Sequence, residues 1–504
     1  MTRRGLLLAT SLVLTILLAS LSYLVFQGFW KTSETAPDII FHNGIVLTME
    51  ESPSQVEAVA IQGEYFVALG DENDVLALAG PNTQLIDLRG RTLLPGFNDA
   101  HSHHIGDRSY VNQSTSDEVI DSLLSAGWTS ISELFVNQER LDGLITLNQQ
   151  DNLRIRVNAY LPLSWQFERF GDWYQTYQPR QEYSSKLRIA GVKIFMDSWY
   201  TDWLHYFDQL ELDALVQQAH DDGFQISIHS VVDNATDIVL NALESALDGE
   251  SNQQHRHRIE HLVLLRDDQI QKLADLEITA SIQLTWFNSD WKEAESWPYL
   301  QNYSHLAGRW RDILEAGIPT MGSTDYPWLI GTDRSAMYVI SSAVTRVGGL
   351  GLTPADWMLN QTISVEQALR LITIDAAYGT FQEDVKGSIK VGKFADLVIL
   401  SDNPLTVPEN TLADIEVLMA MVGGVVEYTA PGQQFLYAAN MRASSQAIEG
   451  SNQPINIEIV DRARFDLFKS YQLTSLSLWS WDDNEDIHPS TDYETRVASR
   501  GVPR

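Results

Sequence analysis

The stretch "LLPGFNDAHSHH", from Leu93 to His104, places three histidines within four residues, just after a Pro-Gly turn. The whole chain contains only 12 histidines. An isolated histidine near a strand end can simply hydrogen-bond a neighbouring loop. In an extended strand, however, successive side chains point to opposite faces, so His101 and His103 share a face from which Ser102 points away. Two imidazoles on one face form half of a metal site.

From this stretch onward, apolar strand-like runs alternate with helix-like stretches; "LDALVQQAHDDG", for example, is followed by "FQISIHS". Such alternation is typical of parallel strands joined by crossover helices. Eight strand-like runs can be counted: "PGFNDAHSHH", "TSISELF", "RIRVNAYL", "GVKIFMD", "QISIHSV", "RIEHLVLL", "EITASIQL" and "IPTMGSTDYP". The pattern predicts an α/β protein built on a (β/α)8 TIM barrel, whose chemistry takes place at the C-terminal ends of its strands.

Short β-rich runs lie on both sides of this region. "DIIFHNGIVLTM" and "AVAIQGEYFVALG" precede it, and "GSIKVGKFADLVIL" and "EVLMAMVGGVVEY" follow it. Neither set has enough strands to be stable alone, so we expect the two sets to pair into one flanking β-sandwich. The predicted organisation is an N-terminal segment at 1–36, the first half of the β-sandwich at 37–92, the barrel at 93–384, the second half of the β-sandwich at 385–430, and a C-terminal extension of unknown role at 431–504.

The charge and the cysteine content exclude several kinds of protein. The 67 acidic residues against 34 basic ones give a formal net charge of −33, which would repel nucleic acid. The chain has no cysteine, so disulfides and thiolate metal sites are impossible. Any metal must be held by histidines, carboxylates or a modified lysine.

The N-terminus predicts a membrane anchor. Arg3 and Arg4 precede an uncharged, mostly apolar run from Gly5 to Trp30 that is long enough to span a bilayer. The arginines should stay cytoplasmic, which places the rest of the chain outside the cytoplasm, in the periplasm if the source is a Gram-negative bacterium. The alternative is a cleaved signal peptide, which would leave a secreted protein.

Polar residues end several of the eight predicted strands. His101 and His103 belong to the first strand; the others are Lys193 on the fourth, His229 on the fifth, His261 on the sixth and Asp325 on the eighth. Buried in apolar surroundings without a partner, each would be costly. A divalent cation would satisfy them together.

The motifs "PGFNDAHSHH", "GVKIFMD", "IHSVVDNATD", "RHRIEHL", "STDYP" and "KGSIKVGKFADLVIL" resemble the amidohydrolase superfamily, most closely its YtcJ-like branch, the amidohydrolase 3 family. The resemblance covers roughly Ile39 to Tyr428. It implies a TIM barrel flanked by a β-sandwich and one or two divalent metals, commonly zinc. The implied ligands are His101, His103, Lys193, His229, His261 and Asp325.

Two of these residues carry a further role in the resemblance. Lys193 stands where some relatives have a carboxylated lysine that bridges two metals; the alternative is an ordinary ammonium paired with Asp197 on the same strand face. Asp325 would act as general base and then general acid beside a metal-activated hydroxide.

The expected activity is metal-dependent hydrolysis of a non-peptide carbon–nitrogen bond in a small molecule, such as an N-substituted amide or an N-acyl compound. One alternative keeps the metal site but cleaves an ester, lactone or phosphotriester. The other is a degenerate, non-catalytic, membrane-anchored binding protein. Retention of all six site residues speaks against a degenerate barrel.

Substrate specificity is where this chain departs from the family pattern. "STDYP", "HSVVDNATD" and "MDSWYTDW" each differ from the usual family motif near the substrate. The tryptophans that follow barrel strands favour an apolar or aromatic substrate, although they can also cap the barrel; they are Trp165, Trp199, Trp203, Trp286, Trp291 and Trp328.

Other polar residues are given supporting or surface roles. We expect His104 to face away from the ligand pair, Glu133 to make structural hydrogen bonds, and Asp233 to orient a loop or a ligand. His220 on a helix, and His255 and His257 in a polar linker, are expected to face solvent.

Overall fold

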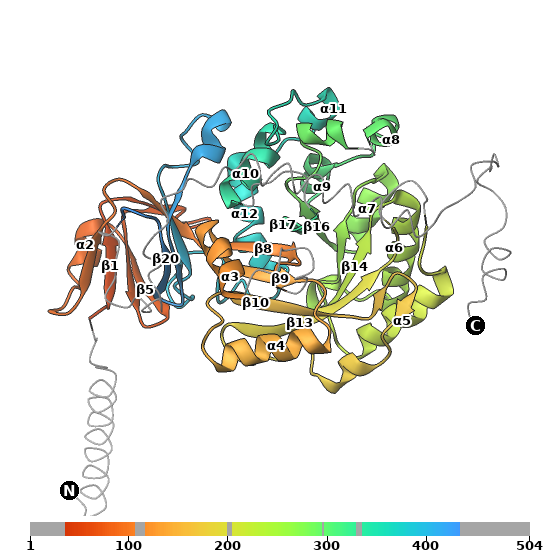
Figure 1. Cartoon of the computed structure of the whole chain (residues 1–504), viewed down its shortest axis with the longest axis horizontal. Helices are drawn as coiled ribbons and strands as arrows, with labels where there is room; N and C mark the ends of the chain where they lie inside the picture. Colours follow the sequence, from red (N-terminus) through yellow and green to blue (C-terminus); the bar gives the residue numbers. More distant parts are fainter. Residues whose placement is uncertain (1–35, 106–115, 199–203, 295–296, 329–334, 434–504) are drawn as a thin grey trace, which may run out of the picture. The chain divides into compact units, whose positions relative to one another are not determined.

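A computed structural model describes residues 36–105, 116–198, 204–294, 297–328 and 335–433 (Figure 1). The expected anchor at Gly5–Trp30, the tryptophans Trp199 and Trp203, and nearly all of the extension at 431–504 lie outside these residues. Within the described ranges, no helix is both long enough and apolar enough to cross a membrane.

Eight parallel strands form the central sheet, and all eight predicted strand-like runs are present in it. Their bounds are β8 Phe97–Ser102, β9 Trp128–Glu133, β10 Arg156–Pro162, β13 Leu187–Phe195, β14 Ile226–Ser230, β15 Arg258–His261, β16 Thr279–Gln283 and β17 Thr320–Ser323. The backbone amide of Asp325 donates to His101 O at 2.8 Å, and that of His103 donates to Tyr326 O at 2.9 Å. These bonds join the first strand to the loop after the last, so the sheet is nearly closed, and the predicted TIM barrel is confirmed.

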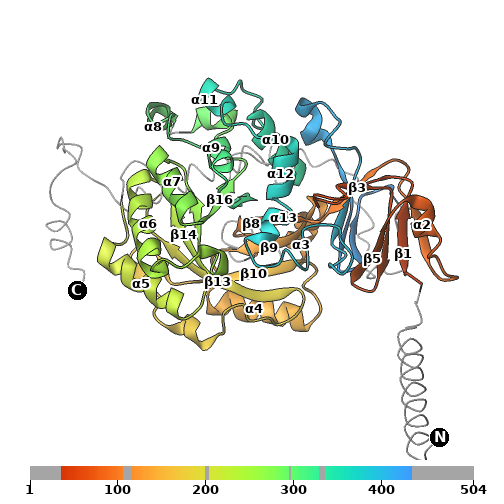
Figure 2. The same ribbon diagram turned by 180° about the vertical axis from the view of Figure 1, so that it is seen from behind.

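Helices connect and cover the strands (Figure 2). Helix α5 (Gln209–Asp221) shows why they form: Asp208 and Glu211 make a capping box at its start, and one face buries Leu212, Val216 and Ala219. The other helices of the barrel region are α3 Ser116–Ser125, α4 Gln138–Gln149, α6 Asp233–Leu247, α7 Asp267–Asp275, α8 Trp297–Asn302, α9 Trp310–Glu315, α10 Ala336–Thr345, α11 Asp356–Leu359, α12 Val365–Leu371 and α13 Ile374–Tyr378.

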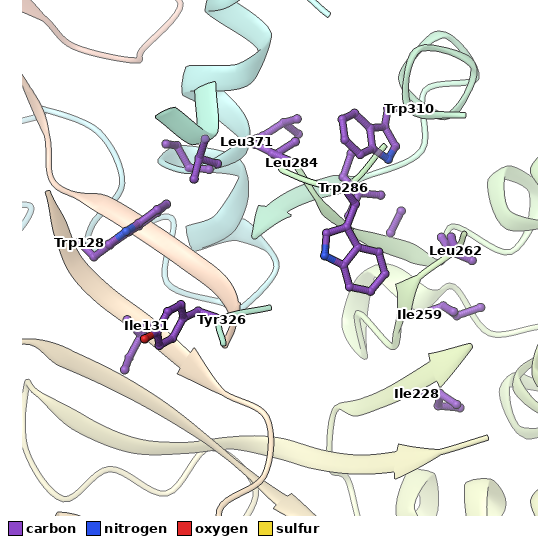
Figure 3. Close-up of a cluster of buried hydrophobic side chains, with 14 of the residues drawn as sticks. Trp128, Ile131, Ile228, Ile259, Leu262, Leu284, Trp286, Trp310, Tyr326 and Leu371 are labelled. Carbon is purple, nitrogen blue, oxygen red and sulfur yellow. The ribbon is translucent and has the colours of Figure 1, made fainter. Parts of the chain in front are cut away.

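The barrel strands and their helices share one large apolar core, some of which is drawn in Figure 3. Ile131, Ile228 and Ile259 come from β9, β14 and β15, and all three are fully buried. Parallel strands covered on both faces need such apolar runs. The charged side chains buried among these strands, such as Lys193, Arg258 and Glu260, are therefore exceptions that require a reason.

Two further sheets flank the barrel. One has the strand order β5-β4-β1-β6 and the other β20-β19-β18-β7-β2-β3. Strand β7 (Thr92–Pro95) pairs antiparallel with β18 (Leu397–Leu400), so the strands before and after the barrel meet in one sheet, as expected. The remaining strands are β1 Ile39–His42, β2 Ile45–Leu47, β3 Gln55–Val56, β4 Ala58–Gln62, β5 Tyr65–Gly70, β6 Gln84–Asp87, β19 Val417–Val422 and β20 Val425–Thr429, with the short helix α2 Glu72–Leu76.

A buried ion pair joins the barrel to this sandwich. Arg156, the first residue of β10, donates to both carboxylate oxygens of Asp396 at 2.6 and 2.8 Å. Both residues are at most 5 % exposed. The pair lies at the amino end of the strands and so does not contribute to the site described next.

Candidate active site

All six predicted site residues lie toward the carboxyl end of the barrel strands. His101 is in β8 and His103 follows that strand directly; His229 is in β14, His261 ends β15, and Asp325 follows β17 by two residues. Lys193 lies within β13, two residues before its end.

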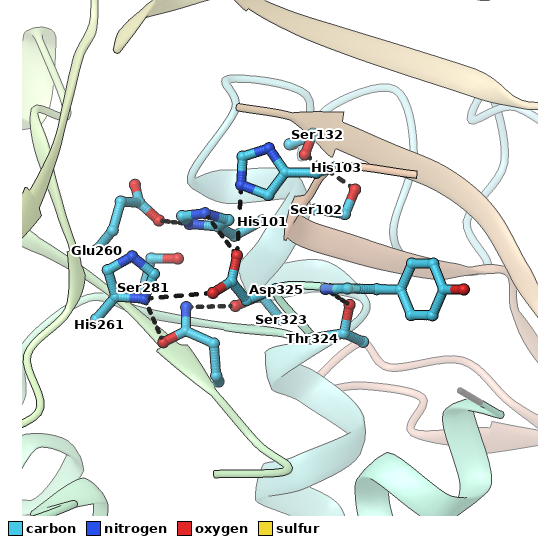
Figure 4. A network of polar contacts seen from close by, with 12 residues as sticks. His101, Ser102, His103, Ser132, Glu260, His261, Ser281, Ser323, Thr324 and Asp325 are labelled. Atoms are coloured by element: carbon cyan, nitrogen blue, oxygen red, sulfur yellow. Dashed lines mark hydrogen bonds and ion pairs between the residues drawn. The ribbon is translucent and has the colours of Figure 1, made fainter. Parts of the chain in front are cut away.

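Asp325 lies at the centre of the histidines (Figure 4). Its Oδ1 is 3.2 Å from His101 Nε2 and 3.4 Å from His103 Nε2, and its Oδ2 is 4.0 Å from His261 Nδ1. Burial would raise the pKa of Asp325, but His101 and His103 outweigh burial and hold that pKa below its ordinary value. The carboxyl is therefore an ionised acceptor. Its backbone has a left-handed φ of 57°, which the hydrogen bond to His101 O helps to hold.

Glu260 orients the ring of His101 through its Nδ1 atom, a role that the sequence did not suggest. The ring nitrogen Nδ1 of His101 lies 2.6 Å from Glu260 Oε2. Glu260 also accepts from Ser227 Oγ at 2.6 Å and from Arg258 at 2.8 Å, and it is fully buried. Burial would raise the pKa of Glu260, but Arg258 and His101 hold it well below its usual range. Because an ionised Glu260 can only accept, His101 Nδ1 carries a proton, and Nε2 is the ring nitrogen that lies on the side of Asp325.

His229 and His261 form a second side of the cluster. Their ring centroids are 4.3 Å apart, and His261 stacks on Trp286 at 5.1 Å with an interplanar angle of 7°. Burial lowers the pKa of His261 to about 3 and that of His229 well below its ordinary value, so both imidazoles are neutral, the form that binds metals. His229 Nε2 is buried 3.4 Å from Asp197 Oδ1 but makes no hydrogen bond among the described residues.

Lys193 is fully buried, and its Nζ has no hydrogen-bond partner within the described ranges of the chain. Burial lowers the pKa of Lys193 to about 8, although Glu260 and Asp325 act in the opposite direction. The carboxylate of Asp197 instead accepts from the backbone amides of Val231 and Val232 at 2.9 Å each. Lys193 Nζ thus makes no hydrogen bond to Asp197 among the described residues, although the charge of Asp197 still acts on its amine.

The donor set fits a divalent cation. His101, His103 and Asp325 each offer a ligand atom within 4.8 Å of the others. Next to them, His229 Nε2 and Lys193 Nζ are buried polar atoms without a hydrogen bond among the residues that the structure describes, which is costly unless a further group satisfies them. Imidazole nitrogen and carboxylate oxygen are the ligands that zinc and related divalent ions take in proteins.

Asp99 is a second residue whose role was not predicted from the sequence. Its Oδ1 accepts from Thr324 N at 3.0 Å and its Oδ2 from Thr324 Oγ1 at 2.5 Å, so it ties β8 to the residue before Asp325. His104 faces away from the cluster, as expected: it lies 3.4 Å from Asp99 and stacks on Tyr326 at 4.7 Å. The signal that could have predicted the role of Asp99 is its position two residues before His101, on the same strand face as the His-x-His pair.

Three further expectations can be compared with the structure. Glu133 accepts a hydrogen bond from Ile105 N at 2.8 Å, as predicted. Asp233 forms an ion pair with Arg266 at 2.8 Å. The prediction that His220, His255 and His257 face solvent is wrong: His257 is fully buried and the other two are half-buried, because the linker that follows the 3-10 helix η2 (Asn252–Gln254) places His257 Nε2 3.0 Å from His220 Nδ1 in α5.

Comparison with known proteins identifies related sequences and folds. Residues 112–428 match the amidohydrolase family. The chain is 29 % identical over 265 residues to an N-substituted formamide deformylase of Arthrobacter pascens, covering 49 % of this chain and 47 % of that protein. It is 24 % identical over 240 residues to the putative amidohydrolase YtcJ of Bacillus subtilis, covering 46 % and 43 % of the two chains. The alignments thus span about half the length of these relatives.

Among solved structures, a metal-dependent hydrolase of Pyrococcus horikoshii has the same fold. The TM-score is 0.61 at 20 % identity, and the match covers 74 % of this chain and 99 % of the other.

Proposed function

Because the chain belongs to the amidohydrolase family, we propose that it is a metal-dependent hydrolase that cleaves a non-peptide carbon–nitrogen bond in a small molecule. The substrate would be an N-substituted amide or an N-acyl compound. The observation that carries the proposal is the buried cluster in which Asp325 faces His101, His103 and His261 at the carboxyl end of the barrel. The N-substituted formamide deformylase among the relatives supports the choice of bond.

His101, His103, His229, His261, Asp325 and Lys193 would hold one or two divalent ions, with zinc the first candidate. When bound, such an ion lowers the pKa of its water to about 7 and polarises the carbonyl of the substrate. Asp325, held ionised by its neighbours, takes the proton that the attacking water gives up. It then delivers this proton to the nitrogen of the leaving amine, so the carboxyl returns to its starting state as the carbon–nitrogen bond breaks.

Lys193 would provide a carbamate. A neutral lysine amine attacks carbon dioxide, forms a carbon–nitrogen bond, and releases one proton, which leaves a carbamate with two oxygen ligands. The lowered pKa of Lys193 supports this reaction because it raises the fraction of neutral amine near neutral pH. The absence of a hydrogen bond to its Nζ among the described residues also supports it.

A substrate panel tests the proposal. Amides and esters with matched acyl groups are offered to the wild-type chain and to Asp325→Asn, and kcat/KM is measured for each. We expect amide hydrolysis to fall by about 10²–10⁴-fold in the variant because its side chain can no longer accept a proton. Asp290→Asn is the matched control: Asp290 is also buried and follows β16 at the same end of the barrel, but its Oδ1 accepts from Leu350 N rather than facing the cluster. It should keep full activity.

Each other outcome points to a different function. Turnover of esters with no turnover of amides would show that the protein cleaves an ester bond instead of the proposed carbon–nitrogen bond. No turnover of either, with ligand binding indifferent to Asp325→Asn, would favour the non-catalytic binding protein.

A further inference from the structure

An aromatic cluster extends outward from the candidate metal site at the carboxyl ends of β9, β10 and β13. Phe195, the last residue of β13, has its ring 5.4 Å from the ring of His229 and 4.9 Å from Lys193 Nζ. Trp165 packs edge-on against Phe195 at 4.6 Å, and Phe135 contacts both at 5.4 and 6.1 Å. The cluster therefore begins at a predicted metal ligand and continues without a break to Trp165.

The hairpin that carries Trp165 is fixed to the strand that carries Lys193. This hairpin consists of β11 (Ser164–Trp165) and β12 (Glu168–Arg169). Leu163 N donates to Lys193 O at 2.8 Å, and Phe195 N donates to the buried Ser164 Oγ at 3.0 Å. Arg169 donates to Tyr206 O at 2.5 Å and stacks on Phe207. The position of Trp165 relative to the site is thus set by backbone and side-chain bonds.

Trp165 nevertheless remains 36 % exposed, whereas Phe195 is 8 % exposed. Two of the other tryptophans expected near the substrate, Trp286 and Trp291, are buried at 4 % and 2 %. An indole that is partly open to solvent, carried on a hairpin bonded to β13 and linked through one ring to His229, can stack on a flat apolar group of a bound molecule.

We propose that Trp165, supported by Phe135 and Phe195, determines specificity by binding an aromatic ring carried by the substrate near its scissile carbon–nitrogen bond. This inference rests on the proposed function and narrows its substrate class to amides with an aromatic substituent. Trp165 is a specificity-determining residue: it touches the substituent and does not participate in bond cleavage. The same surface serves a ring on the acyl side or on the amine side of the bond.

Two pairs of substrates test the inference and separate these sides. The acyl pair is a phenylacetyl and an acetyl amide of one amine; the amine pair is the N-benzyl and the N-methyl amide of one acid. One of these two pairs should have its aromatic ring against Trp165. For that pair, Trp165→Ala should lower kcat/KM for the aromatic substrate by about tenfold and leave kcat/KM for the aliphatic substrate unchanged. Trp165→Phe should restore most of the loss, because it retains a flat ring.

Phe167→Ala is the matched control. Phe167 lies in the same hairpin and is 55 % exposed, but its ring packs on Tyr206 at 5.2 Å, away from Phe195. This variant should leave both members of each pair unchanged. Equal losses for aromatic and aliphatic substrates in Trp165→Ala, or the same loss in Phe167→Ala, would overturn the inference.

The inference and the proposed function fail in different ways. If amides are hydrolysed but kcat/KM for the aromatic amides is the same in the wild type and in Trp165→Ala, the inference fails and the proposed function stands. If no amide is hydrolysed, the function fails. The aromatic site is then decided by calorimetric binding of the N-benzyl amide, which should weaken in Trp165→Ala and not in Phe167→Ala; equal binding to both variants would overturn it.

Discussion

The two ends of the barrel each carry a group of three potential metal ligands, and the two groups differ in chemistry. At the carboxyl end the group is His101, His103 and Asp325; near the amino end of β14 and β15 it is His220, His255 and His257. In both groups, one ligand atom from each residue lies within 4.8 Å of the others. Distance alone therefore does not distinguish them.

The two groups differ in the hydrogen-bond partner of the Nδ1 atom of one histidine in each, His101 and His257. At the carboxyl end, His101 Nδ1 donates a hydrogen bond to the ionised Glu260, so Nε2 is the ring nitrogen on the side of Asp325. Near the amino end, His257 Nδ1 accepts from the backbone amide of Ile226 at 3.1 Å. Because an amide N–H can only donate, the proton of the neutral His257 ring must be on Nε2, which lies 3.0 Å from His220 Nδ1.

His257 thus uses both nitrogens within the fold. His255 Nε2 lies 3.2 Å from Glu250 Oε2, so this residue also has a partner. A metal at this end would have to displace the Nε2 proton of His257 while its other nitrogen still accepts from Ile226. We infer that, of these two groups, the amino-end one is a structural hydrogen-bond relay and the carboxyl-end one is better suited to hold a metal.

The largest expected effect comes from removing the charge that orients His101. Glu260→Gln should weaken metal affinity by about 10–100-fold, because a neutral amide oxygen holds the proton on His101 Nδ1 less strongly than a carboxylate does. It should also reduce stability by roughly 3–5 kcal/mol, because the buried Arg258 loses its counter-ion. Chelator competition gives the first quantity and denaturant unfolding the second.

Arg156→Gln is the matched control for Glu260→Gln. It breaks another buried ion pair, with Asp396, at the amino end of β10. Stability should fall in this variant too, but metal affinity should not change. A comparable loss of metal affinity in both variants would mean that Glu260 acts only through general stability.

A smaller effect should appear in the pH dependence of folding. Burial lowers the pKa of His257, assisted by His220 and His255, and burial and His255 lower that of His220 against the opposing charges of Asp221 and Glu250. A histidine whose folded pKa lies below its unfolded value of about 6.5 takes up its proton on unfolding. This contribution to stability is complete above about pH 6.5 and is lost as the pH falls below that value toward the folded pKa.

His257→Asn isolates this effect from the other buried histidines. The asparagine amide oxygen can still accept from Ile226 N but cannot be protonated. The free energy of unfolding, measured from about pH 8 down to pH 5, should fall less steeply in the variant than in the wild type, by up to about 1.4 kcal/mol per pH unit for each proton. Parallel curves for the two proteins would show that the relay does not titrate with folding.

The strands and the predicted site residues could be read from the sequence because their signals are local. Each barrel strand is a short apolar run, and His101, Lys193, His229 and Asp325 stand out as polar residues at the ends of such runs. Glu260 was missed although Arg258 and Glu260 alternate within β15 and so share a face, which is a period-two signal for a buried ion pair.

The relay could not be predicted because it is not local. The burial of His257 depends on Asn252, whose side chain accepts from His257 N at 2.9 Å and donates to His257 O at 3.0 Å, and on contact with His220 in α5. A polar linker carries no periodic pattern that would place these residues together.

Metal content per chain, measured by elemental analysis after growth with ample zinc and bicarbonate, tests the central claim most directly. The protein is compared with His101→Asn, His257→Asn and Lys193→Ala. We predict that His257→Asn retains the wild-type content, that His101→Asn loses it, and that a wild-type content of two falls in Lys193→Ala if its carbamate bridges the ions. Loss of metal in His257→Asn with full retention in His101→Asn would contradict the assignment of the two ends.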